Sequence, residues 1–365
     1  MDSNRILGYD PQMHKTFLLL FAVIVLNGSC AASSEVVVHE KSWAKGTTSD
    51  LGFETSSFMK ETVYAKPDSL SNDATSSGAY GPFNRDFESG GGKDWFIESQ
   101  RFGVDAIGAG LAWDRKDLID KGLHILDWGF AHQNADGSFS CPDAFHSTAF
   151  FVEAAARTAL LLEASGFKSE YKAWVEKVRP KILAAAKWMA RAPIFEKGLR
   201  GDSIYTHRYY LNADALAFAG LLGSDPALIN ISKKLIEQGM AKQNPSGSNP
   251  EKGGFDTSYH AVGMVFALRY YDFAADEVLR SEMQPMITRA LGWLKGRVNE
   301  DGSFNQTGNT RTGDGQEIGR DKKAKTMSWG SAARAFANWS QISGDSSFER
   351  LAVRVFQYGQ SHRKP

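Results

Sequence analysis

The sequence predicts an all-α protein whose helix pairs close into an α/α toroid, an incomplete double-layered helical barrel. Three observations predict this fold. Apolar residues recur at helical spacing from residue 94 onward, several of these segments are rich in Ala and apolar nearly all round, and no clear run alternates with a period of two. A helix that is apolar on every side needs neighbours on every side, as in the inner layer of a helical ring.

Length and charge limit the alternatives. The chain has 365 residues, of which 42% are apolar, and its 42 basic and 42 acidic residues cancel. This is enough for one large core. Balanced charge argues against nucleic acid or an anionic membrane surface as the main partner.

The N-terminal residues have the composition of a signal peptide. A basic flank precedes the apolar run Thr16–Leu26, and the small residues Gly28–Ala32 follow it. This order is typical of a secretory signal, and the run is short for a membrane span. We therefore expect residues 1–32 to be a signal peptide, the protein to be secreted into the extracellular space, and no membrane contact after cleavage.

Cysteine usage and sequons fit a secreted protein. Cys30 would leave with the signal peptide and Cys141 would remain alone, so no internal disulfide is expected. If the host glycosylates the protein, three Asn-x-Ser/Thr sequons should lie on surfaces that face solvent. They begin at Asn230, Asn305 and Asn338.

Residues 33–93 are expected to form an irregular N-terminal arm. Ser, Thr, Asp and Gly dominate this stretch, which ends in the glycine triplet 90–92. Such composition is typical of extended or poorly ordered chain and not of a second core. The toroid domain would then comprise residues 94–365.

The toroid domain is expected to consist mainly of consecutive helices. Each candidate segment places apolar residues at helical spacing over three or more turns. The segments are Lys116–Asn134, Ser147–Ser165, Tyr171–Ala192, Asn212–Leu222, Pro226–Lys242, Ser258–Phe273, Ala275–Val298, Met327–Ser343 and Ser347–Gln360.

A weak repeat links the helices. A glycine turn and an aromatic residue precede a helix at 133–139, at 253–259 and at 299–304. Glycine permits a tight turn at positive φ, and the aromatic side chain would fill the gap between adjacent helix hairpins. The pattern Gln133-x-x-x-Gly137-x-Phe139 resembles the QW motif of terpene cyclases, which implies the toroid fold but not terpene chemistry.

A second resemblance concerns residues 205–275. The segment His207-Arg208-Tyr209-Tyr210 with the following helix resembles the Asn-Asn-His-x-Tyr-Trp segment of α/α-barrel alginate lyases. Tyr259-His260, with Lys252 seven residues earlier, resembles the Arg and Tyr-His segment of the same enzymes. The resemblance implies that His207 and Tyr259 act at the sugar beside Lys252.

These residue types suit β-elimination from a uronate glycan. Removal of the C5 proton needs a base and a cation or amide donor that neutralises the C6 carboxylate, and the departing O4 needs an acid. We expect a carbohydrate or other small molecule as partner, and neither a metal nor a cofactor. Candidate acid–base residues are His207, Tyr259, His260 and Tyr210, and candidate substrate-binding residues are Lys252, Arg208, Arg311, His146, Asn212 and Asp256.

Two alternatives stay open at this point. A glycoside hydrolase on the same scaffold would use a pair of acids, for which Asp143 and Asp256 are the candidates. A non-catalytic or repurposed toroid would bind a glycan or small molecule, or catalyse another elimination or cyclisation. The lyase hypothesis depends on the His, Tyr and cationic side chains meeting at one end of the ring.

Overall fold

A computed structural model describes residues 50–313 and 317–362. The expected signal peptide lies outside the described residues. Among those that are described, no helix is long and apolar enough to cross a membrane.

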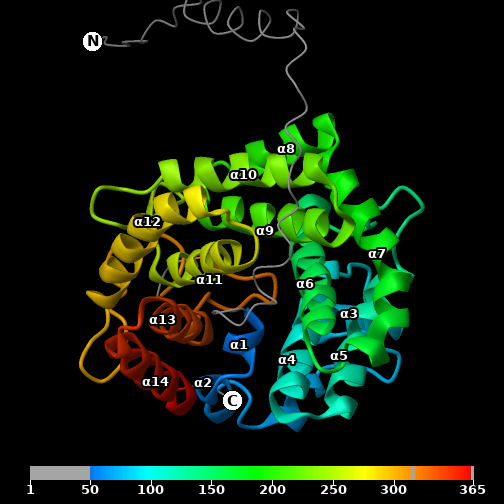
Figure 1. The fold of residues 1–365 in the computed structure, drawn as a ribbon, viewed down its shortest axis with the longest axis horizontal. Coiled ribbons are helices and arrows are strands. Elements are labelled where there is room, and N and C mark those ends of the chain that lie inside the picture. Colours follow the sequence, from blue (N-terminus) through cyan, green and yellow to red (C-terminus); the bar gives the residue numbers. More distant parts are fainter. Residues whose placement is uncertain (1–49, 314–316, 363–365) are drawn as a thin grey trace, which may run out of the picture. The chain divides into compact units, whose positions relative to one another are not determined.

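The described residues form the predicted α/α toroid. Five helix hairpins follow one another along the chain, and the first helix of each lies in the inner layer (Figure 1). The hairpins are α4 (Gly103–Trp113) with α5 (Lys116–Ala131), α6 (Ala144–Ala164) with α7 (Lys168–Ala190), α9 (Thr206–Gly223) with α10 (Pro226–Ala241), α11 (Thr257–Phe273) with α12 (Glu277–Lys295), and α13 (Trp329–Ser343) with α14 (Ser346–Ser361).

The inner helices are buried nearly all round, as their composition predicts. In α9, for example, residues from Leu211 to Gly220 are all buried. Ala and Gly at many of these positions let neighbouring helices approach closely on both sides. The outer helices bury one face and expose the other, which explains their more polar sequences.

The segment from residue 50 to residue 93 differs from the expected arm. It consists of short helices joined by turns, but it is packed into the core rather than detached from it. Phe53, Phe58, Met59 and Tyr64 are all buried in the common hydrophobic cluster. The short elements are α1 (Asp50–Glu54), α2 (Ser57–Glu61), the 3₁₀ helix η2 (Pro67–Ser71) and α3 (Gly81–Glu88), and η3 (Ile97–Phe102) follows them.

The glycine turn is a true structural repeat, although its members differ from those expected. Turns 133–139, 243–249 and 298–304 share one backbone pattern: the Asn amide donates to the Ser carbonyl, and the Gly amide donates back to the Asn carbonyl. Each follows an outer helix and leads toward the next inner helix. Residues 253–259, expected as a repeat member, instead include the second strand of a short hairpin.

That hairpin joins β1 (Pro250–Glu251) to β2 (Gly254–Phe255), and its turn carries Lys252 and Gly253 at positive φ. Two helix boundaries also differ from expectation. Helix α8 (Ala192–Asp202) was not foreseen, and α9 starts at Thr206 rather than Asn212. His207 therefore lies in the first turn of a helix.

The sequons are not equally exposed. Asn230 and Asn305 are exposed, whereas Asn338 is buried in α13. The expectation that all three sequons face solvent is therefore wrong for Asn338, because its side chain packs within an inner helix.

Candidate active site

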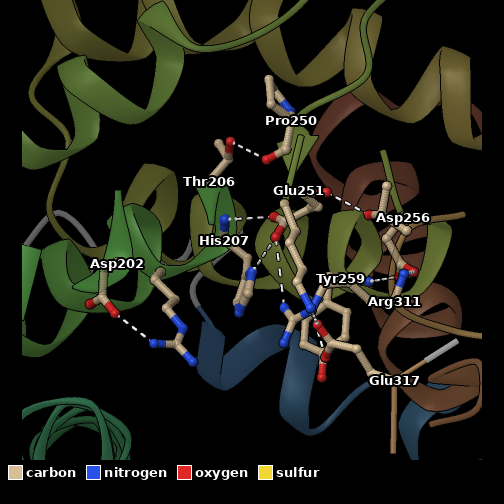
Figure 2. A network of polar contacts seen from close by, with 12 residues as sticks. Asp202, Thr206, His207, Pro250, Glu251, Asp256, Tyr259, Arg311 and Glu317 are labelled. Atoms are coloured by element: carbon tan, nitrogen blue, oxygen red, sulfur yellow. Dashed lines mark hydrogen bonds and ion pairs between the residues drawn. The ribbon is translucent and has the colours of Figure 1, made fainter. Parts of the chain in front are cut away.

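A carboxylate–imidazole pair forms the centre of the candidate site (Figure 2). The hairpin brings Glu251 against the first turn of α9, where its Oε1 accepts the backbone N–H of His207 at 2.9 Å and its Oε2 lies 2.8 Å from His207 Nδ1. Both side chains are almost fully buried, at 0% and 2% exposed. A carboxylate at this distance favours a proton on Nδ1, so Nε2 is the ring nitrogen that Glu251 does not contact.

Tyr259 and Arg311 lie beside this pair. The rings of His207 and Tyr259 are 4.8 Å apart between centroids. The Arg311 guanidinium lies 3.5 Å from the centre of the Tyr259 ring and 4.4 Å from that of Tyr205, an arrangement that favours the cation. Its NH1 also forms a 3.8 Å ion pair with Glu251 Oε2. Segments about fifty residues apart therefore converge on one point.

Asp256 positions the site but offers no free oxygen. Its Oδ1 accepts from the Tyr259 amide at 2.9 Å and caps α11, while its Oδ2 accepts from the amides of Arg311 and Thr312 at 3.0 and 2.7 Å. The side chain is fully buried. The structure gives Asp256 a positioning role in place of the expected one as a substrate contact or hydrolytic acid, because both of its oxygens accept backbone amides.

Glu317 was missed by sequence reasoning. It accepts from Arg311 Nε at 3.2 Å, from Lys252 at 2.5 Å and from Lys325 at 2.5 Å. Burial raises the pKa of Glu317, but the bonds from the two lysines and the charge of Arg311 outweigh it and hold the pKa at about 2. The expected cation Lys252 is thus present at the site, with its charge shared by this carboxylate.

Arg208 lies on the other side of His207. Its NH1 donates to Asp202 Oδ1 at 2.7 Å, and Asn212 donates to Asp202 Oδ2 at 2.9 Å. Arg208 is partly exposed, whereas Asn212 is fully buried. Asn212 therefore supports the Arg208–Asp202 pair from behind, and its expected contact with substrate stays a prediction.

His146 opens α6, the inner helix next to α9. It is 7% exposed, and its Nδ1 has no hydrogen-bond partner among the described residues. Burial lowers the pKa of His146 well below its usual value, and the positive charge of Arg208 adds to this effect. His207 and Tyr259, in the first turns of α9 and α11, meet as expected, and His146 lies in the first turn of α6, the inner helix packed against α9.

Two expected catalytic residues lie elsewhere. Tyr210 is fully buried, with its hydroxyl facing Met286 of α12 and its ring against Gly239 of α10. His260 is fully buried as well: Nδ1 accepts from the Asn249 amide at 3.1 Å and Nε2 lies 3.0 Å from the Ala290 carbonyl. The structure does not bring either residue into the candidate site, because both face the outer helices.

A further charged group lies where α6 begins. Arg320 pairs with Glu98 at 2.5 Å and with Asp143 at 3.7 Å. Burial raises the pKa of Asp143 above its usual value. No group of three or more His, Cys, Asp or Glu residues in the described part of the chain could hold a metal ion.

Two surface hollows lie away from these residues. The larger, of about 460 Å³, is lined by Asp301 and by Arg354 and Tyr358 of α14. The smaller, of about 300 Å³, lies between Gln133 and Lys181. Both occur where a glycine turn meets the next outer helix, so they are features of the scaffold and not of the candidate site.

Comparison with known proteins agrees on the fold. No protein-family model matches the chain, and no curated protein matches it in sequence. The crystal structure of unsaturated glucuronyl hydrolase from Bacillus sp. GL1, responsible for the degradation of glycosaminoglycan, is similar, with a TM-score of 0.50 and 14% identity over 88% of this chain and 85% of that chain. A UGL variant with dGlcA-Glc-Rha-Glc is similar with a TM-score of 0.53 and 13% identity, over 84% of this chain and 86% of that one. The chain shares the α/α toroid fold of these proteins.

Proposed function

We propose that the protein is a secreted enzyme that cleaves a uronate-containing glycan by β-elimination at His207 and Tyr259. The observation that carries the proposal is the arrangement of the Glu251–His207 pair against Tyr259 and Arg311. It supplies a base, an acid and a cation within one cluster.

His207 is the proposed base. Because Glu251 holds the proton on Nδ1, the lone pair of Nε2 is available, and Nε2 makes no hydrogen bond to any described residue. It would remove the proton from C5 of the uronate. The electrons of that C–H bond would form the C4=C5 double bond as the bond from C4 to the glycosidic oxygen breaks.

Tyr259 is the proposed acid. Its phenol lies beside the His207 ring and would donate its proton to the departing O4, which becomes the hydroxyl of the new end. His207 then holds one extra proton and Tyr259 lacks one, so a proton transfer through solvent restores both. The cations Arg311 and Lys325 would stabilise the carboxylate charge that grows as C5 loses its proton. The Arg311 guanidinium lies 3.5 Å and Lys325 Nζ lies 5.4 Å from the centre of the Tyr259 ring.

One observation favours hydrolysis as a second candidate. Asp143 and Glu98 are both held by Arg320, and burial raises the pKa of Asp143, as a general acid requires. The solved proteins that share the fold include a hydrolase. Because both carboxylate oxygens of Asp256 already accept backbone amides, the hydrolase hypothesis would pair Asp143 with Glu98 instead.

The direct test is to incubate the full chain with polyuronate substrates and follow two signals. β-Elimination creates a conjugated double bond that absorbs in the ultraviolet, whereas hydrolysis releases reducing ends without that absorbance. We expect both signals to rise together. Release of reducing ends alone, abolished by Asp143→Asn, would establish the hydrolase; saturable binding without either signal would establish a non-catalytic toroid.

A substitution at Tyr259 tests its role as the acid. Tyr259→Phe keeps the ring under Arg311 and removes the hydroxyl, so turnover should fall about 10²–10⁴-fold with little change in stability. Tyr271→Phe is the matched control, since Tyr271 lies twelve residues further along the same helix. Full activity in Tyr259→Phe would remove Tyr259 from the mechanism.

A further inference from the structure

Three neighbouring inner helices start at the candidate site. The first turns of α9 and α11 meet through His207 and Tyr259, and α6, whose first turn contains His146, packs against α9. Helix starts carry partial positive charge on their unpaired amides. A helix start favours an anionic ligand only where its amides are not already bound by a carboxylate of the protein.

Two of these helix starts are satisfied by the protein and the third is not. The amide of His207 donates to Glu251, and that of Tyr259 donates to Asp256. In α6 the preceding residue, Asp143, has φ of 51° and does not cap the helix. The amides of Ala144, Phe145 and His146 donate to none of the described residues.

Two side-chain nitrogens on α6 and α9 are also buried without a hydrogen-bond partner among the described residues. They are His146 Nδ1 and Arg208 Nε, although Arg208 itself is partly exposed and its NH1 donates to Asp202. Side chains in a helix generally lean toward its N-terminus, and the His146 ring packs edge-on against Phe150 one turn further along α6. The nearby carboxylates of Glu98 and Asp143 are paired with Arg320.

We propose that the first turn of α6, together with His146 and Arg208, forms a second anion subsite that holds the carboxylate or sulfate of the sugar next to the one at His207. This inference rests on the proposed function for the place of the reacting sugar. It makes the substrate a glycan with charges on successive residues. A glycan with one isolated uronate would leave these donors unused.

The test measures binding apart from turnover. Galacturonic acid and its di- and trimer are titrated calorimetrically into the full chain under conditions in which no cleavage is detected. We expect the dimer to bind roughly tenfold more tightly than the monomer, because a second carboxylate engages α6. Equal affinity for monomer, dimer and trimer would overturn the inference.

One substitution should block the subsite and leave the fold intact. Ala144→Asp places a carboxylate in the first helical turn, which suits the helix dipole but repels a bound anion. It should remove the advantage of the dimer while the affinity for the monomer stays unchanged. Ser346→Asp, in the first turn of the outer helix α14, is the matched control.

His146→Phe provides a second variant, since it keeps the ring against Phe150 and removes both nitrogens. It should weaken dimer binding about three- to tenfold. A dimer advantage that survives both variants contradicts the inference. A dimer advantage that both variants remove, with no cleavage of any polyuronate in the separate activity assay, would support the subsite and contradict the proposed elimination, so the two proposals fail separately.

Discussion

At the scale of single residues, the site depends on a carboxylate that carries no substrate role of its own. Glu251 binds the His207 amide, the His207 ring and the Arg311 guanidinium at once. Its charge therefore fixes both the orientation of the imidazole and the position of the cation. A buried carboxylate that served packing alone would be costly unless paired in this way.

Glu251→Gln should prevent His207 Nε2 from acting as the base, while the protein still folds. The Gln oxygen can still accept the His207 amide, but the NH₂ group would then face Nδ1 and move the ring proton to Nε2. Turnover should fall about 10²–10⁴-fold. Glu300→Gln, on an exposed turn, is the control, and unchanged kinetics in Glu251→Gln would contradict the role of the pair.

Part of the site could be predicted from the sequence, and the reason for the rest is geometric. Tyr259 and His260 are consecutive, so they lie about 100° apart around a helix and cannot both face the site. The sequence pattern marks Tyr259 and His260 as candidates, but it does not show that Tyr259 faces Arg311 and His260 faces α12. Glu251 was missed because its partner His207 lies 44 residues away in sequence. Glu317 has Arg311 and Lys325 within eight residues, but its contact with Lys252 joins residues that are 65 positions apart.

At the scale of elements, the glycine turns hold the two helical layers together. At positions 137, 247 and 302 the glycine has φ above 90°, and a Cβ there would come within 2.3 to 2.6 Å of a carbonyl oxygen in the next outer helix. The first and last of these turns can be recognised in the sequence by their Gly-Ser-Phe ending. The middle one cannot, because Asn249 stands where the other two have the aromatic residue.

Gly302→Ala should therefore destabilise the protein more than the backbone angle alone would. Positive φ costs an L-residue about 1–2 kcal/mol, and contact with the Arg354 carbonyl adds to it, so we expect a loss of about 2–4 kcal/mol. Gly344 has φ of 76° but open space around it, so Gly344→Ala should cost about 1 kcal/mol. Urea unfolding measures both, and equal losses would contradict the steric argument.

The Glu317 clamp should make stability depend on pH. Because the pKa in the folded state, about 2, is below the ordinary value of 4.5, the ionised form is favoured in the folded state. The contribution is therefore complete above about pH 5 and is lost as the pH falls toward the folded pKa. The difference in unfolding free energy between the wild type and Glu317→Gln should shrink between about pH 5 and pH 3. A difference that does not depend on pH would mean that the clamp acts by packing alone.

At the scale of the whole molecule, the short N-terminal helices are part of the ring. Figure 1 shows α1 and α2 between the α13–α14 hairpin and α4. Glu54 of α1 is buried against Arg157 of α6, which also pairs with Glu153. Polar composition suggested an arm, because composition averages over the few apolar residues that enter the core. The toroid itself was predictable, because the helical spacing of apolar residues and the apolar composition on every side can be read within each segment alone.

This placement predicts that residues 50–64 unfold together with the rest of the toroid. Met59 is fully buried, so Met59→Ala should lower the unfolding free energy by about 2–5 kcal/mol through lost burial and a cavity. Glu61→Ala, on the exposed side of the same helix, should change it by less than about 0.5 kcal/mol. Tryptophan fluorescence and circular dichroism should report one coincident urea transition in both variants. A small effect of Met59→Ala, or an early transition confined to one probe, would show that the ring holds without this segment.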